Sequence, residues 1–404
     1  MNIPSFRCNG IHLTPAEQAK CPICARKTTL FKIKSLIDKE SFFGDSLTPF
    51  VGHYGYPNLN VGYLSLPEQN EQSWLHDAPS YWASKEYKIP QIVDLRSSLI
   101  NSRFKLNIKQ QSKLLEIGQE VAMASKPVDI EIDLNKKPSF QMDFSSYNSP
   151  MGPIGSLRRA VITDNPKIKA SVEKVYSDTD LKAKDAMVYL YGKDFDEHFL
   201  TKILSIGTIG LKFQRKLVPT RWSVVSVDDT IGKHLINEIK SYNEVDSYTA
   251  YFGSYLGNYY LIMLFPEVWS YELFESYART PLFSTTDFEC YEGRKNYAEN
   301  TVGGYYACRI GILEKLKKMK KQASVLVLRF ITEEYTVPMG VFVCRETTRK
   351  SLQSNPIEFS SKELILKYAS ALIKKKFGLN IDEILKKSVL LNNLKTQKKL
   401  SEFT

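Results

Sequence analysis

The chain lacks the short motifs that mark several large enzyme classes. It has no phosphate-binding loop of the G-x4-GK[ST] type, no H-E-x-x-H and no G-x-S-x-G. These absences argue against an ordinary ATPase, a zinc protease and an α/β-hydrolase. Cysteine is also scarce, at six in 404 residues, which fits a reducing compartment and not a disulfide scaffold.

Only one segment is long and uncharged enough to be mistaken for a membrane span. Residues 247–266 run without a charge, but they contain five tyrosines, two glycines and the turn-like "LGN" at 256–258. We therefore predict a buried β-hairpin here. The first ten residues show no basic leader followed by an apolar stretch, so we expect no secretory signal and a cytoplasmic, nucleoid-associated protein without membrane contact.

The composition is that of a folded chain with an excess of positive charge. Apolar and aromatic residues make up 43% of the 404 residues, and the formal net charge is +11. That charge favours an anionic partner, either nucleic acid or an acidic membrane surface, and cannot choose between them. Residues 362–404 hold ten lysines against four acidic residues, so the C-terminus is predicted to be a cationic arm.

Helix-like and strand-like segments are mixed without regular alternation, which favours an α+β fold with a mixed sheet and flanking helices. Helices are predicted at 105–124, 167–190, from 228 onwards and at 361–377. Strands are predicted after 124 ("VDIEIDL") and at 221–227, 324–331 and 340–346. The predicted domains are a Cys-rich head (1–30), an α+β core (31–360) with a subdomain boundary near 135–150, a C-terminal helix and basic arm (361–396), and a terminal motif (397–404).

The Cys-rich head has the spacing of a structural zinc site. Cys8, His12, Cys21 and Cys24 form the pattern C-x3-H-x8-C-x2-C, and "CPIC" is the spacing by which two thiolates hold one side of a tetrahedral ion. In so short a segment a zinc ion would replace a hydrophobic core. The alternative is three reduced cysteines with a solvent-facing His12, the ligand that matches least well.

An aspartate pair follows the predicted strand at 221–227. Asp228 and Asp229 would lie where this strand leads into a helix, and paired carboxylates there could hold a divalent metal for phosphodiester chemistry, as in a nuclease. The alternative is that one aspartate caps the helix. The sequence favours the cap and leaves catalysis undecided.

Basic residues flank the same region and predict a DNA-binding surface. They are Arg215, Lys216 and Arg221, together with Arg158 and Arg159 after "PMGPIGS". Their contacts would be to phosphates and so carry little base information. Trp222 is predicted to lie in the core instead of stacking on a base.

The last eight residues, "QKKLSEFT", place Gln397, Leu400 and Phe403 three positions apart. In a 3₁₀ turn these side chains lie on one side and form a single plug for a partner's pocket. The pattern resembles the PIP motif, the peptide that binds the sliding clamp PCNA, with Thr404 in place of the usual second aromatic residue. The alternative is a chance match in a terminal tail.

Several longer stretches resemble one protein family. "CPIC", "FVGHYGYPNLNVG", "DLRSS", "SPMGPIGSLRRA", "RKLVPTRWSVVSVDDTIG" and "QKKLSEF" are similar to segments of the archaeal Nre family of DNA-repair proteins, over nearly the whole chain. The resemblance implies a role in DNA-damage repair, recruitment by PCNA through the C-terminal motif, and an N-terminal zinc-binding head. This chain has His12 where the family favours a fourth cysteine, and the resemblance does not settle any catalytic activity.

Three functions follow from these observations. The first is a clamp-tethered repair protein that binds DNA and processes it in some way. The second is a non-catalytic adaptor between the clamp and other repair proteins. The third is an RNA-binding protein with a fortuitous terminal match.

Overall fold

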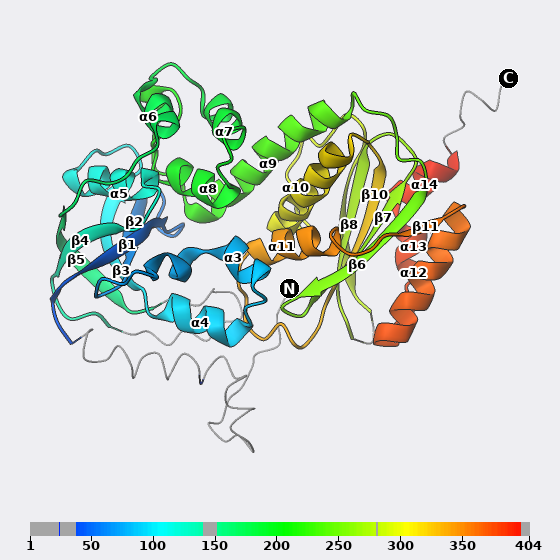
Figure 1. Cartoon of the computed structure of the whole chain (residues 1–404), viewed down its shortest axis with the longest axis horizontal. Helices are drawn as coiled ribbons and strands as arrows, with labels where there is room; N and C mark the ends of the chain where they lie inside the picture. Colours follow the sequence, from blue (N-terminus) through cyan, green and yellow to red (C-terminus); the bar gives the residue numbers. More distant parts are fainter. Residues whose placement is uncertain (1–23, 25–37, 140–151, 280–281, 397–404) are drawn as a thin grey trace. The chain divides into compact units, whose positions relative to one another are not determined.

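A computed structural model of the chain describes Cys24 and residues 38–139, 152–279 and 282–396 (Figure 1). The chain divides into two compact units. Unit 1 runs to Ile231 and includes Thr336–Met339, and unit 2 comprises Gly232–Tyr335 and the chain from Gly340. Each contains a β-sheet with flanking helices, which confirms the α+β class. The predicted boundary near 135–150 falls between two strands of unit 1.

The sheet of unit 1 is a closed five-stranded barrel of order β1-β2-β3-β5-β4 (Figure 1). The strands are β1 (Ser41–Val51), β2 (Asn58–Ser65), β3 (Ile100–Asn107), β4 (Val128–Leu134) and β5 (Ile154–Ile162). β3 and β5 are parallel, while the other neighbours are antiparallel. Helix α5 (Lys113–Met123) connects β3 to β4. This strand order, with a helix between the third and fourth strands, is the topology of the OB-fold.

Alternating side chains fill the barrel. Along β2, Leu59, Val61 and Tyr63 are buried, while the residues between them face outward. The interior cluster also takes residues from β1, β3, α5, β4 and β5: Phe42, Ile100, Ile117, Ile130, Ile132, Leu134, Leu157 and Ala160. The Ser112 hydroxyl accepts a hydrogen bond from the Leu115 amide at the start of α5 and so caps it. The predicted helix at 105–124 was therefore wrong in its first part, which belongs to β3.

The rest of unit 1 is helical. Between β2 and β3 lie η1 (Ser73–Asp77), α3 (Pro79–Ser84) and α4 (Ile89–Ser97). After β5 come α6 (Ala170–Ser177), α7 (Ala183–Tyr191), α8 (Glu197–Ser205), η2 (Lys212–Gln214) and α9 (Thr220–Ile239), whose residues from Gly232 belong to unit 2. The helix predicted at 167–190 is thus two helices, α6 and most of α7. The strand predicted at 221–227 was wrong, because this segment forms the beginning of α9.

Unit 2 is built on a six-stranded sheet of order β11-β6-β7-β10-β8-β9. Its strands are β6 (Tyr248–Tyr255), β7 (Asn258–Phe265), β8 (Ser270–Tyr277), β9 (Ser284–Glu289), β10 (Ser324–Ile331) and β11 (Ile357–Phe359). β6 and β7 form the predicted hairpin, with Leu256 and Gly257 at positive φ in its turn. β10 confirms the predicted strand at 324–331.

Helices cover both faces of this sheet (Figure 1). On one face are α10 (Val302–Met319) and α11 (Phe342–Ser351), and on the other are α12 (Lys362–Phe377), α13 (Asp382–Lys387) and α14 (Val389–Thr396). The α12 to α14 face is mainly apolar, and Leu326, Leu328 and Phe330 of β10 pack there against Ile365 and Ile373. Residues 361–396, predicted as a helix followed by an arm, are thus three packed helices.

The opposite face of the sheet is rich in buried charge. Glu289 of β9 accepts a hydrogen bond from Arg309 of α10 at 2.7 Å, and both side chains are fully buried. Arg329 of β10 pairs with Glu275 of β8 and donates to the Asn258 side chain at 2.6 Å. Each of these four buried charges therefore has an opposite charge beside it, which offsets the cost of removing the ions from water.

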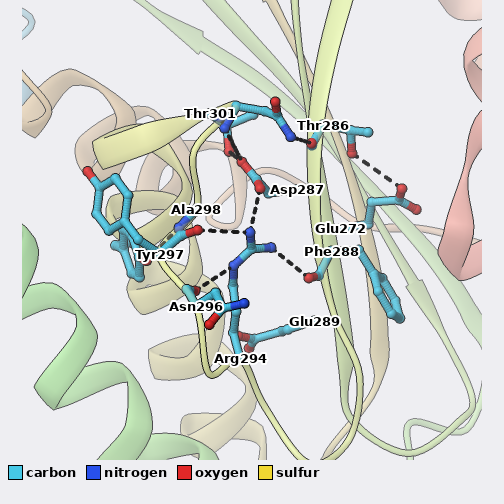
Figure 2. A network of polar contacts seen from close by, with 12 residues as sticks. Glu272, Thr286, Asp287, Phe288, Glu289, Arg294, Asn296, Tyr297, Ala298 and Thr301 are labelled. Atoms are coloured by element: carbon cyan, nitrogen blue, oxygen red, sulfur yellow. Dashed lines mark hydrogen bonds and ion pairs between the residues drawn. The ribbon is translucent and has the colours of Figure 1, made fainter.

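A network around Asp287 fastens the loop between β9 and α10 (Figure 2). Its carboxylate accepts hydrogen bonds from Arg294 Nη2 at 2.7 Å, from the backbone amides of Asn300 and Thr301, and from the Thr301 hydroxyl. Arg294 also donates to the carbonyl oxygens of Phe288, Asn296 and Tyr297. These bonds use both carboxylate oxygens, so the network supports the loop.

The strand predicted at 340–346 was also wrong, because residues 342–346 form the beginning of α11. The buried hydroxyls of this helix bond to carbonyl oxygens one turn back: Thr347 to Val343, Thr348 to Cys344 and Ser351 to Thr347. Among the helices in the described part of the chain, none is long and apolar enough to cross a membrane.

Candidate nucleic-acid interface

The loop between β1 and β2 presents two exposed tyrosines on a firmly held backbone. Tyr54 is 76% exposed and Tyr56 49% exposed. The Gly52 amide donates to the Asn60 carbonyl, the Asn58 amide to the Gly55 carbonyl, and the Ile108 amide to the Pro57 carbonyl, at 2.8–3.0 Å. Hydrogen bonds thus hold the loop to β2 and to the end of β3, and the two tyrosine side chains are exposed on this held backbone.

Trp222 extends this aromatic surface. It lies in the first turn of α9, and its ring centroid is 5.7 Å from that of Tyr56. The start of α9 is held against the barrel by a hydrogen bond of 2.9 Å from the Val51 amide to the Thr220 hydroxyl. Trp222 is 48% exposed, so the prediction that it lies in the core was wrong. Trp222 stays at the surface because the start of α9 is held to the barrel by this hydrogen bond.

Basic side chains lie on the outer surface of the same strands. Opposite β2, strand β3 places Lys105 beside Asn60 and Arg103 beside Gly62. Leu59 and Val61 point into the barrel, so Asn60 and Gly62, which alternate with them, are on its outer side. Directly opposite residues of an antiparallel pair lie on the same side of the sheet, so Lys105 and Arg103 are also on the outer side. Lys105 and Lys109 are exposed.

Lys216 joins this surface from a distant part of the chain. The amide of its neighbour Leu217 donates to the Ile108 carbonyl at 2.9 Å, which places residues 216–217 alongside the end of β3. Lys216 and Arg221 are both exposed. The structure therefore brings these two predicted residues into the region of the aromatic loop.

The segments that build this surface contain no acidic residue. Residues 46–67, 95–115 and 198–227 include no aspartate or glutamate, whereas the last two include ten lysines and arginines. Lys105, Lys109, Lys216 and Arg221 are exposed and have no acidic residue in their own segments, so they favour an anionic ligand.

Arg215 has a different role from the one predicted. Its guanidinium donates to the carbonyl oxygens of Gly210, Tyr176 and Asp178 at 2.8–2.9 Å and lies over the Tyr176 ring. Partial burial lowers its pKa. These bonds join the loop after α8 to the end of α6, so Arg215 supports the fold.

Arg158 and Arg159 lie on β5, and each has a side chain that is 61% exposed. Both are near Asp133 of β4, at 4.0 Å and 3.4 Å. The Ser41 hydroxyl and then these arginines lower the pKa of Asp133. Exposed pairs of this kind contribute little stability, so both arginines remain available to a phosphate.

The aspartate pair does not have the geometry predicted for a metal site. Asp228 and Asp229 lie within α9 and not at the end of a strand, and Asp228 is buried. Consecutive residues on a helix point about 100° apart, so the two carboxylates cannot face one ion together. The helix-cap interpretation is equally wrong, since both residues are inside the helix.

The remaining predicted sites lie largely outside the described residues. Of the predicted zinc ligands, Cys24 is described and Cys8, His12 and Cys21 are not. The predicted clamp-binding residues Gln397, Leu400 and Phe403 come after the last residue of α14 and are also outside the described part. Within the described ranges, no cluster of three or more metal-ligating side chains occurs.

Sequence reasoning did not identify Tyr54, Tyr56, Arg103, Lys105 and Lys109 as interface residues. The available signal was "HYGYP", a glycine turn with two aromatic residues between two strand-like segments. Without the barrel topology, that signal gave no reason to place the basic residues of β3 beside it.

Two family models match successive parts of the chain. Residues 16–284 match the N-terminal region of archaeal Nre, and residues 289–403 match its C-terminal region. The chain belongs to the archaeal Nre family. No solved structure matches it.

Curated members of the Nre family resemble the chain over most of its length. The DNA repair protein NreA of Haloferax volcanii is 35% identical over 336 residues, which cover 78% of this chain and 80% of that protein. The DNA repair proteins NreB and NreA of Archaeoglobus fulgidus are 34% and 35% identical, covering 88% and 89% of this chain and 89% and 91% of those proteins.

Proposed function

We propose that this Nre protein acts in DNA repair, binds DNA through the basic surface of unit 1 and is recruited by the sliding clamp PCNA through residues 397–404. The names of its relatives support the repair role. The observation that carries DNA binding is the positive surface formed by the acid-free segments around β2, β3 and the start of α9. Arg158 and Arg159 on β5 extend the binding surface, and Lys216 and Arg221 contribute to its centre.

Clamp binding rests on the terminal motif and on where the fold ends. Helix α14 packs on the sheet of unit 2 through Leu390 and Leu391, and Gln397 follows its last residue. The motif therefore begins next to a packed helix, and little chain separates the clamp from unit 2. Leu400 and Phe403 are the apolar anchors, and Gln397 is the hydrogen-bonding member.

Calorimetry of PCNA with the full chain, Phe403→Ala and a variant without 397–404 tests this part of the proposal. Burial of a Phe side chain contributes about 1.5–3 kcal/mol, so Phe403→Ala should weaken binding roughly ten- to a hundredfold. The deletion should abolish it. Equal affinity in all three proteins would refute recruitment through this motif. A control, Val389→Ala in α14, changes an exposed apolar residue outside the motif and should bind as the wild type does.

The proposal includes a structural zinc ion in the N-terminal head, held by Cys8, Cys21, Cys24 and His12. Three thiols and an imidazole make a closed donor set suited to a structural site. Metal analysis of protein purified without chelator should find about one equivalent of zinc per chain. Cys21→Ser should lower this content, whereas Cys290→Ser, which changes an exposed thiol of unit 2, should not. Unchanged zinc in Cys21→Ser would exclude the site.

A further inference from the structure

The loop between β1 and β2 combines exposed aromatic rings with a positive surface. We propose that Tyr54, Tyr56 and Trp222 form a stacking platform for the unpaired bases of single-stranded DNA, with phosphates held by Lys105, Lys109, Lys216 and Arg221. This proposal rests on the DNA binding proposed above for unit 1 and specifies the form of DNA that is bound.

The topology supports this location. The barrel has the strand order of the OB-fold, and in such barrels the outer face of the second and third strands and the loop between the first and second bind oligonucleotides. Tyr54 and Tyr56 are in that loop, and Lys105 is on that face. The side chains suited to bases and to phosphates thus occupy the positions at which this fold receives a strand.

The rings are exposed although the backbone beneath them is rigid. Hydrogen bonds fix Gly52 and Gly55 to β2, and Pro57 to Ile108 at the end of β3. His53 packs on Tyr54, with ring centroids 4.0 Å apart, and Tyr56 packs on Trp222. A ring that is held in place loses little conformational entropy when a base stacks on it, which favours binding.

The chemistry of the platform favours a single strand over a duplex or a protein. In duplex DNA the flat faces of the bases are covered by their neighbours, so exposed rings can stack only on unpaired bases. A protein partner would cover the rings but would need acidic groups to match the surrounding lysines. Single-stranded DNA supplies both an aromatic face and a negative phosphate at every nucleotide.

The outer surface next to the platform gives the strand a path. On the outer side of β2, Asn58 is exposed and Asn60 is partly exposed, whereas Gly62 is buried. A Cβ at Gly62 would clash with the Asn101 side chain and lie 3.3 Å from Cγ of Arg103. Arg103 therefore covers Gly62, and it adds a cation beside Lys105 on the outer face of β3.

Fluorescence anisotropy with the full chain tests the platform. Labelled oligothymidine of about 16 nucleotides, the upper site size for one such barrel, is compared with a duplex and an RNA of equal length. The Tyr54→Ala/Tyr56→Ala variant should bind the single strand roughly a hundredfold more weakly, at about tenfold for each ring. Its affinity for duplex should change by less than about threefold, since phosphate contacts remain.

Conservative variants separate stacking from a general disturbance of the fold. Tyr56→Phe and Trp222→Phe should retain most of the affinity, because both keep a ring. Phe283→Ala removes a ring that is 62% exposed in unit 2 and should bind as the wild type does. DNA should quench the fluorescence of Trp222 in the wild type, and Trp222→Phe should remove that component of the signal.

The outcomes distinguish this inference from the function on which it rests. If the double variant binds the single strand as tightly as the wild type while Lys105→Glu/Lys216→Glu weakens it, unit 1 binds DNA and the platform is refuted. If neither set changes binding, or the wild type does not bind DNA, DNA binding by this surface fails as well. If the wild type binds RNA more tightly than DNA and Tyr54→Ala/Tyr56→Ala removes that binding, the ligand of the platform is RNA and not DNA.

Discussion

Asp77 of unit 1 carries a negative charge that is mostly shielded from solvent, and His198 holds it. Nε2 of His198 lies 2.7 Å from Oδ2 of Asp77. Burial alone would raise the pKa of Asp77, but His198, with Lys202 and Arg96, outweighs burial and lowers it to about 2. The ion pair joins η1 to α8 and thereby connects the insertion between β2 and β3 with the helices that follow the barrel.

We predict that Asp77→Asn destabilises the protein in a pH-dependent way. A lowered carboxyl pKa stabilises the folded state above the unfolded value of about 4, and this contribution is lost as the pH falls towards 2. The shift corresponds to about 2 kcal/mol. In urea unfolding near pH 5, about one unit above the pKa of the unfolded state, the free energy of unfolding of the variant should be lower than that of the wild type by this amount. The difference should shrink as the solution is acidified. The exposed control Asp180→Asn should show none, and a deficit that stays constant with pH would contradict the account.

Two neighbouring basic residues show what a sequence can reveal at this scale. Arg215 and Lys216 look alike in the sequence, yet Arg215 binds three backbone carbonyls while Lys216 is exposed. The carbonyl oxygens of Tyr176, Asp178 and Gly210 that hold Arg215 are brought together only by the tertiary fold. The sequence thus indicated a basic region but could not separate cations that support the fold from cations that are exposed.

At the scale of elements, helix α14 is fastened to the sheet by Glu272 of β8. The carboxylate accepts hydrogen bonds from the Ser388 hydroxyl at 2.6 Å and from the amides of Val389 and Leu390 at 3.1 and 3.0 Å. Burial raises the pKa of Glu272, and these hydrogen bonds oppose that rise. A carboxylate at a helix N-terminus satisfies amides that have no partner within the helix.

We predict that Glu272→Ala loosens α14 without unfolding unit 2. Loss of a capping acceptor costs about 0.5–2 kcal/mol, so amide hydrogen exchange in α14 should accelerate roughly tenfold. Thr286→Val removes another hydrogen bond to Glu272, of 3.3 Å, and should leave α14 protected. Unchanged exchange in Glu272→Ala would show that apolar packing alone holds the helix.

Elements marked by a turn signal or by a clear local period were predictable, including the short strands β4 and β10, whereas others were not. The hairpin at 248–265 and helix α12 agree with their predictions, because a turn signal or a long periodic run marked them. "RWSVVSV" favoured a strand through its β-branched residues. In α9, however, Val227, Ile231, Leu235 and Ile239 are buried at intervals of four, and this helical period appears only when residues beyond 227 are included.

The barrel was not predictable for a related reason. Residues 66–99 separate β2 from β3 and contain helices of their own, so the five strands do not form a run at regular spacing. The pairing of β3 with β5 is parallel and bridges distant segments, which local patterns do not encode. The position of Trp222 beside Tyr56 depends on this barrel.

At the scale of the whole molecule, the two family regions share one sheet. The N-terminal family region ends at 284 and the C-terminal region begins at 289, but β10 of the latter lies between β7 and β8 of the former. Neither region contains the complete sheet of unit 2. Experiments on function therefore need the full chain, which also retains the clamp motif after α14.

The proposed function places DNA on the basic surface of unit 1 and not on the lysines near the C-terminus. Two triple variants of the full chain with the same change in net charge separate these sites. One is Lys105→Glu/Lys216→Glu/Arg221→Glu in unit 1. The other is Lys367→Glu/Lys374→Glu/Lys375→Glu on the exposed side of α12.

DNA affinity should be measured for both variants at salt concentrations from about 50 to 200 mM. The slope of the logarithm of affinity against the logarithm of salt concentration increases with the number of phosphate contacts. We predict that the unit 1 variant binds DNA about a hundredfold more weakly, and that the magnitude of this slope decreases by about two to three. The α12 variant should stay within about threefold of the wild type, since it loses no direct phosphate contact. The opposite result, with binding lost in the α12 variant and retained in the unit 1 variant, would show that DNA does not bind to the basic surface of unit 1.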